Sequence, residues 1–72
     1  MPKLVRVSYR ELATKLRRAG YLEIRTSRHP VYYLEEKNIT IPVPRHAGEV
    51  PVGTLRAIVR EMGITVEDFN EL

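Results

Sequence analysis

The stretch that decides the fold is YLEIRTSRHPVYYLEEKNITIPV, residues 21–43. It contains three short runs with strong β propensity, and residues that favour turns separate each run from the next. Connections this short join antiparallel strands, because parallel neighbours need a crossover of about a dozen residues or more. We therefore predict a three-stranded antiparallel meander, with strands in residues 21–26, 31–35 and 39–43.

The first and third strands carry further information. Apolar and polar residues alternate along the first strand, with Leu22 and Ile24 on one face and Glu23 and Arg25 on the other. This is the pattern of a half-buried strand, so we expect the apolar pair to face the core. Pro42 has no backbone N–H to donate, which restricts the third strand to an edge of the sheet.

Two amphipathic helices flank the predicted sheet. Ser8 and Glu11 have the spacing of a capping box at the start of the first helix. Gly20 is placed to end that helix as a left-handed cap, and Gly63 ends the second helix. The apolar stripes are Tyr9, Leu12, Ala13, Leu16 and Ala19 in the first helix, and Leu55, Ile58, Val59 and Met62 in the second.

A final short helix is expected after Thr65, where residues 65–68 have the form of another capping box. Its apolar side consists of Val66, Phe69 and Leu72. The predicted fold class is α+β with the order αβββα, in which two helices pack on one face of a three-stranded antiparallel sheet and a short helical turn ends the chain. This layout resembles that of double-stranded-RNA-binding domains.

Length and composition limit what the protein can be. A chain of 72 residues supports one domain, residues 1–72, with one small core. There is no cysteine, which excludes disulfides and thiolate metal sites and fits the cytosol better than a secreted location. Charged residues interrupt every hydrophobic segment, so we expect a soluble protein with no membrane span.

Charge is unevenly distributed along the chain. Residues 1–60 carry all 12 Lys and Arg against 5 acidic residues, a balance of +7, whereas residues 61–72 carry 4 acidic residues and no basic one. A basic body on so small a domain suggests a polyanionic partner. A surface that is merely well solvated explains the same charges, and composition leaves both interpretations open.

The arginines are the candidates for holding phosphate groups. Glu11 and Lys15 have the i,i+4 spacing of a helical ion pair, which leaves Arg10, Arg17 and Arg18 together on one flank of the first helix. Each arginine also has the simpler interpretation of a solvated side chain. The candidate RNA-binding residues are Arg10, Arg17, Arg18, Arg25, Arg28, Arg45, Arg56 and Arg60.

This sequence lacks the residues that most catalytic mechanisms require. Two histidines, no cysteine and no clustered carboxylates offer no convincing zinc or magnesium site, and no glycine-rich nucleotide loop is present. Ser8 is better explained as a helix cap, which leaves little for a hydrolytic triad. Proton transfer by histidine remains, and RNA is its natural substrate because the 2′-hydroxyl of RNA is itself a nucleophile.

His29 is the first candidate for this proton transfer. It directly precedes Pro30, and a residue before proline favours an extended backbone. We therefore expect the His29 ring to project from a turn or from the start of a strand. Its ordinary pKa of about 6.5 leaves the imidazole mostly neutral, as a base, at pH 7. A solvated turn histidine explains the same spacing, and His46, in the proline-rich loop, is a possible second acid or base.

Taken in order, these residues resemble the HicA toxin family, the small ribonucleases of HicAB toxin–antitoxin pairs. The resemblance covers residues 11–72 and is carried by four segments: ELATKLRRAGYLEIRTS, RHPVYYL, ITIPVPRHAGEVPVGTLRAIVREMGIT and VEDFNEL. It implies a fold like that of double-stranded-RNA-binding domains and translation-independent cleavage of mRNA in the cytoplasm. No cofactor is implied.

The resemblance also assigns residues and a partner. The family's catalytic histidine lies at the start of the second strand, which is the place of His29, and Gly20 matches the glycine that ends the first helix. Family members usually have Gly-Ser before the histidine, whereas this chain has Ser27 and Arg28. The implied partner is a HicB-type antitoxin. A non-catalytic RNA-binding module and a protein whose main task is to bind another protein are the alternatives.

Overall fold

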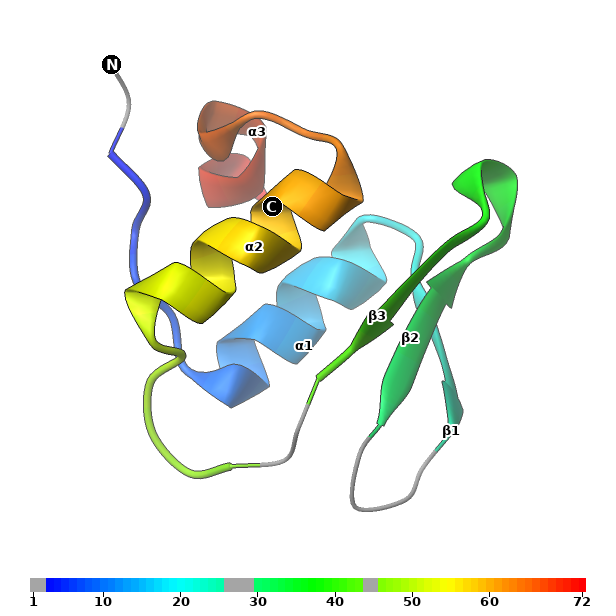
Figure 1. Ribbon diagram of the computed structural model, residues 1–72, viewed down its shortest axis with the longest axis horizontal. Helices are drawn as coiled ribbons and strands as arrows, with labels where there is room; N and C mark the ends of the chain where they lie inside the picture. Colours follow the sequence, from blue (N-terminus) through cyan, green and yellow to red (C-terminus); the bar gives the residue numbers. More distant parts are fainter. Residues whose placement is uncertain (1–2, 26–29, 44–45) are drawn as a thin grey trace.

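The computed structural model of the protein describes residues 3–25, 30–43 and 46–72. The order of elements confirms the predicted α+β class and the αβββα arrangement, followed by a short helix (Figure 1). These elements are α1 (Tyr9–Arg18), β1 (Leu22–Arg25), β2 (Val31–Leu34), the 3₁₀ turn η1 (Glu35–Lys37), β3 (Ile39–Pro42), α2 (Val52–Met62) and α3 (Val66–Glu71).

The three strands form one antiparallel sheet in the order β1-β2-β3. At its centre, Tyr32 of β2 lies opposite Glu23 of β1 and Ile41 of β3. Asn38 closes the turn before β3 in the left-handed conformation, with φ 54°. β3 lies at an edge of the sheet, which confirms the position inferred from Pro42.

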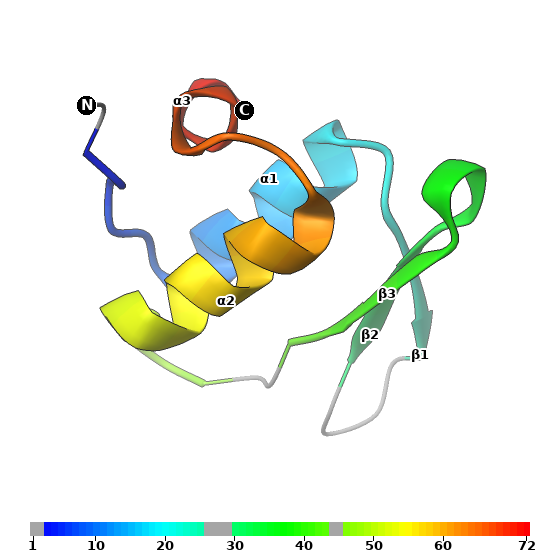
Figure 2. The ribbon, with the colours of Figure 1, turned by 45° about the horizontal axis from the view of Figure 1, so that its top comes forward.

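The core lies between the sheet and the two longer helices. α1 and α2 are on the same side of the sheet, and α3 lies beyond them, away from the strands (Figures 1 and 2). Tyr32 and Ile41 are buried on the face of the sheet that meets the helices. The largest fully enclosed side chains come from the three helices, from β3 and from the segments before β1 and α2: Leu12, Leu16, Tyr21, Ile41, Val50, Leu55, Met62 and Phe69.

Both ends of α1 have the chemistry that the sequence predicts. The Ser8 hydroxyl accepts from the Glu11 N–H at 3.0 Å, and the Ser8 N–H donates to the Glu11 carboxylate at 2.9 Å. The hydrogen bond from the Ser8 backbone N–H stabilises the charged carboxylate and so lowers the pKa of the Glu11 carboxyl. Gly20 follows the helix with φ 100°, and a Cβ there would lie 3.3 Å from the Leu34 side chain. Only glycine meets both conditions without strain.

The expected ion pair between Glu11 and Lys15 is replaced by a tertiary contact. The Lys15 ammonium donates to the backbone carbonyls of Phe69, Asn70 and Leu72 at 3.1, 3.3 and 3.2 Å. It also lies 5.1 Å from the centroid of the buried Phe69 ring. A cation at the C-terminal end of a helix satisfies free carbonyls and complements the helix dipole. Lys15 and Phe69 therefore dock α3 onto α1.

The predicted orientation of β1 is wrong. Leu22 and Ile24 are 70% and 59% exposed, while Glu23 pairs with buried Tyr32 on the helix-facing side. The register shifts between Glu23 and Arg25, and the helices cover only the face that carries Tyr32. The alternation of apolar and polar residues shows that the two faces of a strand differ, but the helices that pack on the sheet decide which face is buried.

The same substitution on the two sides of the structure tests this orientation. Leu12→Ala should lower the free energy of unfolding by about 2–5 kcal/mol, because it leaves a cavity in the core. Leu22→Ala should change it by no more than about 0.5 kcal/mol, because the side chain is exposed. Urea unfolding followed by circular dichroism measures both. Similar large losses in the two variants would contradict the orientation of β1.

Candidate functional site

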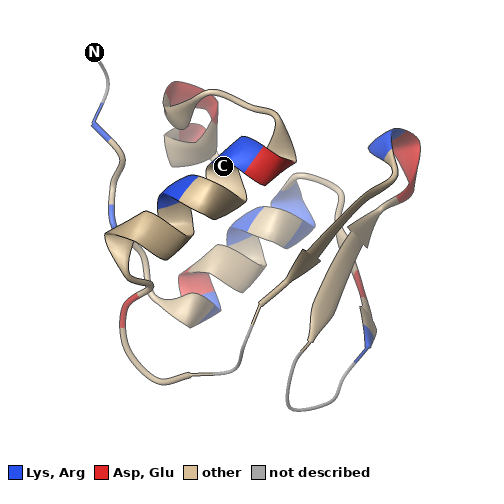
Figure 3. Cartoon of the chain, in the orientation of Figure 1, with Lys and Arg blue, Asp and Glu red and all other residues tan. Residues whose placement is uncertain are grey.

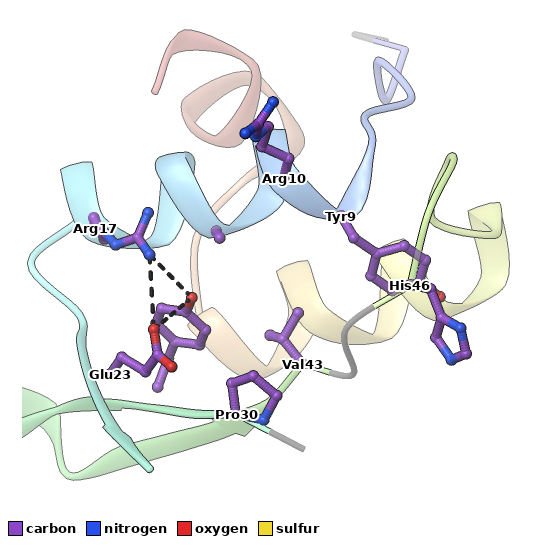
Figure 4. Close-up of a pocket in the computed structure, with 9 residues that line it drawn as sticks. Tyr9, Arg10, Arg17, Glu23, Pro30, Val43 and His46 are labelled. Atoms are coloured by element: carbon purple, nitrogen blue, oxygen red, sulfur yellow. Dashed lines mark hydrogen bonds and ion pairs between the residues drawn. The ribbon is translucent and has the colours of Figure 1, made fainter. Parts of the chain in front are cut away.

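A pocket of about 460 Å³ opens between α1 and the sheet (Figure 4). One wall consists of α1 residues, and the sheet and its connections supply the rest. The α1 wall consists of Tyr9, Arg10, Ala13 and Arg17, and the opposite side of Glu23, Pro30, Tyr32, Val43 and His46.

The α1 wall follows from helical periodicity. Tyr9, Ala13 and Arg17 are spaced at i, i+4 and i+8, so they form one row along the helix. Leu12 and Leu16 form the neighbouring row of the helix, and this row is fully buried in the core. The pocket therefore receives an aromatic ring, a methyl group and a guanidinium group in sequence along one helix. The small side chain of Ala13 leaves the middle of the wall open.

A polar cluster forms the Arg17 end of the pocket. The Tyr32 hydroxyl donates to Glu23 Oε1 at 3.4 Å, and Arg17 Nη2 lies 3.5 Å from that hydroxyl and 3.7 Å from the same carboxylate oxygen. Arg17 also lies over the Tyr32 ring, 5.9 Å from its centroid. The Arg17 side chain is 57% exposed, whereas the Glu23 side chain is 17% exposed. The guanidinium group is therefore oriented by neighbours and still accessible to an anion.

The other end of the pocket carries two rings. Tyr9 and His46 have ring centroids 5.5 Å apart with planes tilted by 51° (Figure 4). Their proximity follows from the backbone, because the Tyr9 N–H donates to the Gly48 carbonyl at 3.1 Å and Ser8 forms a β-bridge with Glu49. Tyr9 is half-buried and His46 is exposed. The loop that carries His46 is thus tied to the start of α1.

The structure brings some of the predicted site residues together. Arg10, Arg17 and His46 all line the pocket. His29, Arg28 and Arg45 lie outside the described residues. Pro30, which directly follows His29 in the sequence, is buried and contributes to the pocket wall.

Other predicted cations lie elsewhere. Arg18 joins Arg10 at a second hollow beside the C-terminus, so the expected arginine flank of α1 divides between two depressions. Arg25, at the end of β1, and Arg56 and Arg60, on α2, are exposed and outside the pocket lining (Figure 3).

Tyr9 and Glu23 are among the pocket residues that were not predicted as site residues. Tyr9 was placed with the apolar core stripe of α1, although its spacing to Arg17 also gives a row that ends in a cation. Glu23 was placed on the polar face of β1, and no local signal shows that this face meets the helices. The described residues contain no group of three or more His, Cys, Asp or Glu side chains placed to hold a metal ion.

Comparison with known families now adds to this geometry. A family model described as the HicA toxin of bacterial toxin–antitoxin systems matches residues 9–64, from α1 to just beyond α2. The chain belongs to the HicA toxin family. This confirms the resemblance on which the sequence analysis relied, and a fold like that of double-stranded-RNA-binding domains is consistent with the structure.

Membership of the HicA family identifies a toxin that is paired with an antitoxin. A search among curated proteins found no match. Within residues 3–25, 30–43 and 46–72, every helix is too short or too polar to cross a membrane.

Removing the negative charge at the Arg17 end tests whether the pocket attracts anions. Glu23→Gln should raise the affinity for inorganic polyphosphate by roughly twofold to fivefold, since Arg17 loses a competing carboxylate. Isothermal titration calorimetry at low salt measures this affinity. The matched control is Glu49→Gln, which removes a carboxylate paired with Arg6 outside the pocket. A weaker affinity in Glu23→Gln would mean that Glu23 mainly positions Arg17.

Proposed function

We propose that the protein is a metal-independent endoribonuclease that cleaves mRNA, with His29 as the proton-transfer group. The observation that carries the proposal is the pocket, which combines Arg10, Arg17 and His46 with Pro30, the residue that follows His29. Cations for phosphate and a titratable imidazole therefore line the same pocket. Membership of a toxin family supports a damaging activity of this kind.

The proposed reaction uses the nucleophile of the substrate. A neutral imidazole takes the proton of an RNA 2′-hydroxyl, and the 2′ oxygen attacks the adjacent phosphorus. The bond between phosphorus and the 5′ oxygen then breaks, which gives a 2′,3′-cyclic phosphate and a 5′-hydroxyl once the leaving oxygen is protonated. Arginine side chains stabilise the charge that develops on the non-bridging phosphate oxygens.

His29 and His46 are assigned the two proton transfers in this scheme. His29 is the first group, and His46, which lines the pocket and contacts Tyr9, is the candidate second group. Arg10 and Arg17 are the phosphate-binding residues, while Arg18, Arg25, Arg28, Arg45, Arg56 and Arg60 are proposed to attract RNA at longer range. Histidine side chains can both take and give a proton near neutral pH, which suits the two transfers.

The proposed partners are mRNA in the cytoplasm and a HicB-type antitoxin. A basic toxin favours an antitoxin with acidic groups at the contact, since charge complementarity speeds association and excludes other partners.

The departure from the family at Ser27 and Arg28 favours one alternative, a non-catalytic RNA-binding module. That alternative predicts salt-sensitive RNA binding without any cleavage product.

The decisive variant is His29→Ala. It should lower the rate of RNA cleavage by at least about 100-fold, because a positioned acid or base contributes that much. The wild-type rate should not change in excess EDTA. Denaturing gels of a labelled oligoribonucleotide measure both rates, and circular dichroism checks that the variant folds.

A substrate control accompanies this variant. Once the cleavage site is mapped, a single 2′-deoxyribose at that nucleotide should abolish cleavage. Equal rates for wild type and His29→Ala would remove His29 from the mechanism. Cleavage of the deoxy substrate would show that water is the nucleophile.

A further inference from the structure

We propose that the pocket binds one unpaired nucleobase of the RNA, stacked on Tyr9, so that single-stranded RNA is the substrate class. This inference rests on the proposed function and assigns Tyr9 the role of a base-binding residue. It concerns how the substrate is held, whereas the assignment of His29 concerns how it is cut.

The lining of the pocket suits a planar aromatic ligand. Tyr9 and His46 contribute rings, Ala13, Pro30 and Val43 contribute apolar surface, and polar groups gather at the opposite end. Pockets for small aromatic groups combine mainly apolar walls with a few polar groups that set the orientation. A lining made only for phosphate would instead consist mostly of cations and backbone N–H groups.

Cations flank this apolar surface on the same helix. Arg10 follows Tyr9 directly, and Arg17 lies two turns further along α1. In Figure 4 the Arg17 side chain points across the pocket toward Glu23, whereas the Arg10 side chain projects from α1 away from the sheet. Proteins that bind single strands combine aromatic rings for the bases with positive charge along the backbone path. The row on α1 provides both within one element.

Two contacts with the loop that carries His46 restrict the position of Tyr9. Its backbone N–H is bonded to Gly48, and its ring contacts His46 in a tilted arrangement. Because the side chain is half-buried, part of it remains available at the pocket. A residue whose position is already restricted loses less conformational entropy when a base stacks on its ring.

The polar end provides groups for the edge of the base. The Glu23 carboxylate and the Tyr32 hydroxyl line the pocket opposite the two rings. A carboxylate accepts hydrogen bonds from exocyclic amino groups and ring N–H groups of bases. An unpaired base offers these groups, whereas a base in a duplex has already used them.

Duplex RNA should therefore be a poor ligand, although the fold is like that of double-stranded-RNA-binding domains. A base must leave its stack and its partner to enter the pocket, which costs a few kcal/mol. Domains that bind duplex RNA contact phosphates and 2′-hydroxyls along the minor groove and need no such pocket.

The test measures binding rather than cleavage. The ligand is a 2′-O-methyl RNA oligonucleotide, which has no free 2′-hydroxyl, and a set of copies carries one abasic site at each position in turn. Stacking of a base on an aromatic side chain contributes roughly tenfold to affinity. Tyr9→Leu should therefore weaken binding of the intact single strand by about tenfold, whereas Tyr9→Phe should bind like wild type.

Abasic ligands make the assignment specific. At one position, loss of the base should weaken wild-type binding by a similar factor and should remove the difference between wild type and Tyr9→Leu. Such coupling between one base and one side chain is what a merely structural role of Tyr9 would not produce. The control is Tyr33→Leu on the opposite face of the sheet, which should leave affinity unchanged.

The outcomes separate the two proposals. Equal affinity for the intact strand and every abasic copy would overturn the base pocket, as would equal affinity for the single strand and its duplex. If either occurs while ordinary RNA is still cleaved, the ribonuclease proposal stands alone. If Tyr9→Leu fails to fold, the comparison of abasic ligands with wild type still decides.

Discussion

The burial of Leu12 and Leu16 is the constraint on which the rest of the structure depends. Both side chains are completely enclosed, so α1 can rotate little without opening a cavity in the small core. The resulting orientation of α1 about its axis places the row of Tyr9, Ala13 and Arg17 along the pocket. The α1 wall of the pocket is therefore positioned by residues that do not line the pocket.

Contacts from distant parts of the chain secure α1 at both ends. The Tyr9 N–H binds the Gly48 carbonyl, which brings the loop of His46 to the helix start. Lys15 binds the carbonyls that end α3, and Phe69 beside it is buried. A 72-residue chain has little apolar surface to bury, so such hydrogen bonds help to define one arrangement. The position of the pocket follows from this arrangement.

Sequence periodicity predicted the elements well, because helix caps and apolar stripes are local features. Ser8, Gly20 and Gly63 mark helix ends where the structure has them. The orientation of β1 and the inclusion of Glu23 in the pocket were not predictable, because they depend on which face of the sheet α1 covers. Arg10, Arg17 and His46 were chosen from charge and chemistry, and only the fold shows that they share one pocket.

The central claim is that the pocket on α1 is the place where RNA is bound and cut, and Ala13→Leu tests it most directly. The substitution fills the open middle of the wall without changing any charged or titratable group. The account predicts normal folding and at least about a tenfold loss of cleavage, as expected when one stacking contact is blocked. Ala57→Leu, on the exposed side of α2, is the matched control. Undiminished cleavage by folded Ala13→Leu would contradict the account.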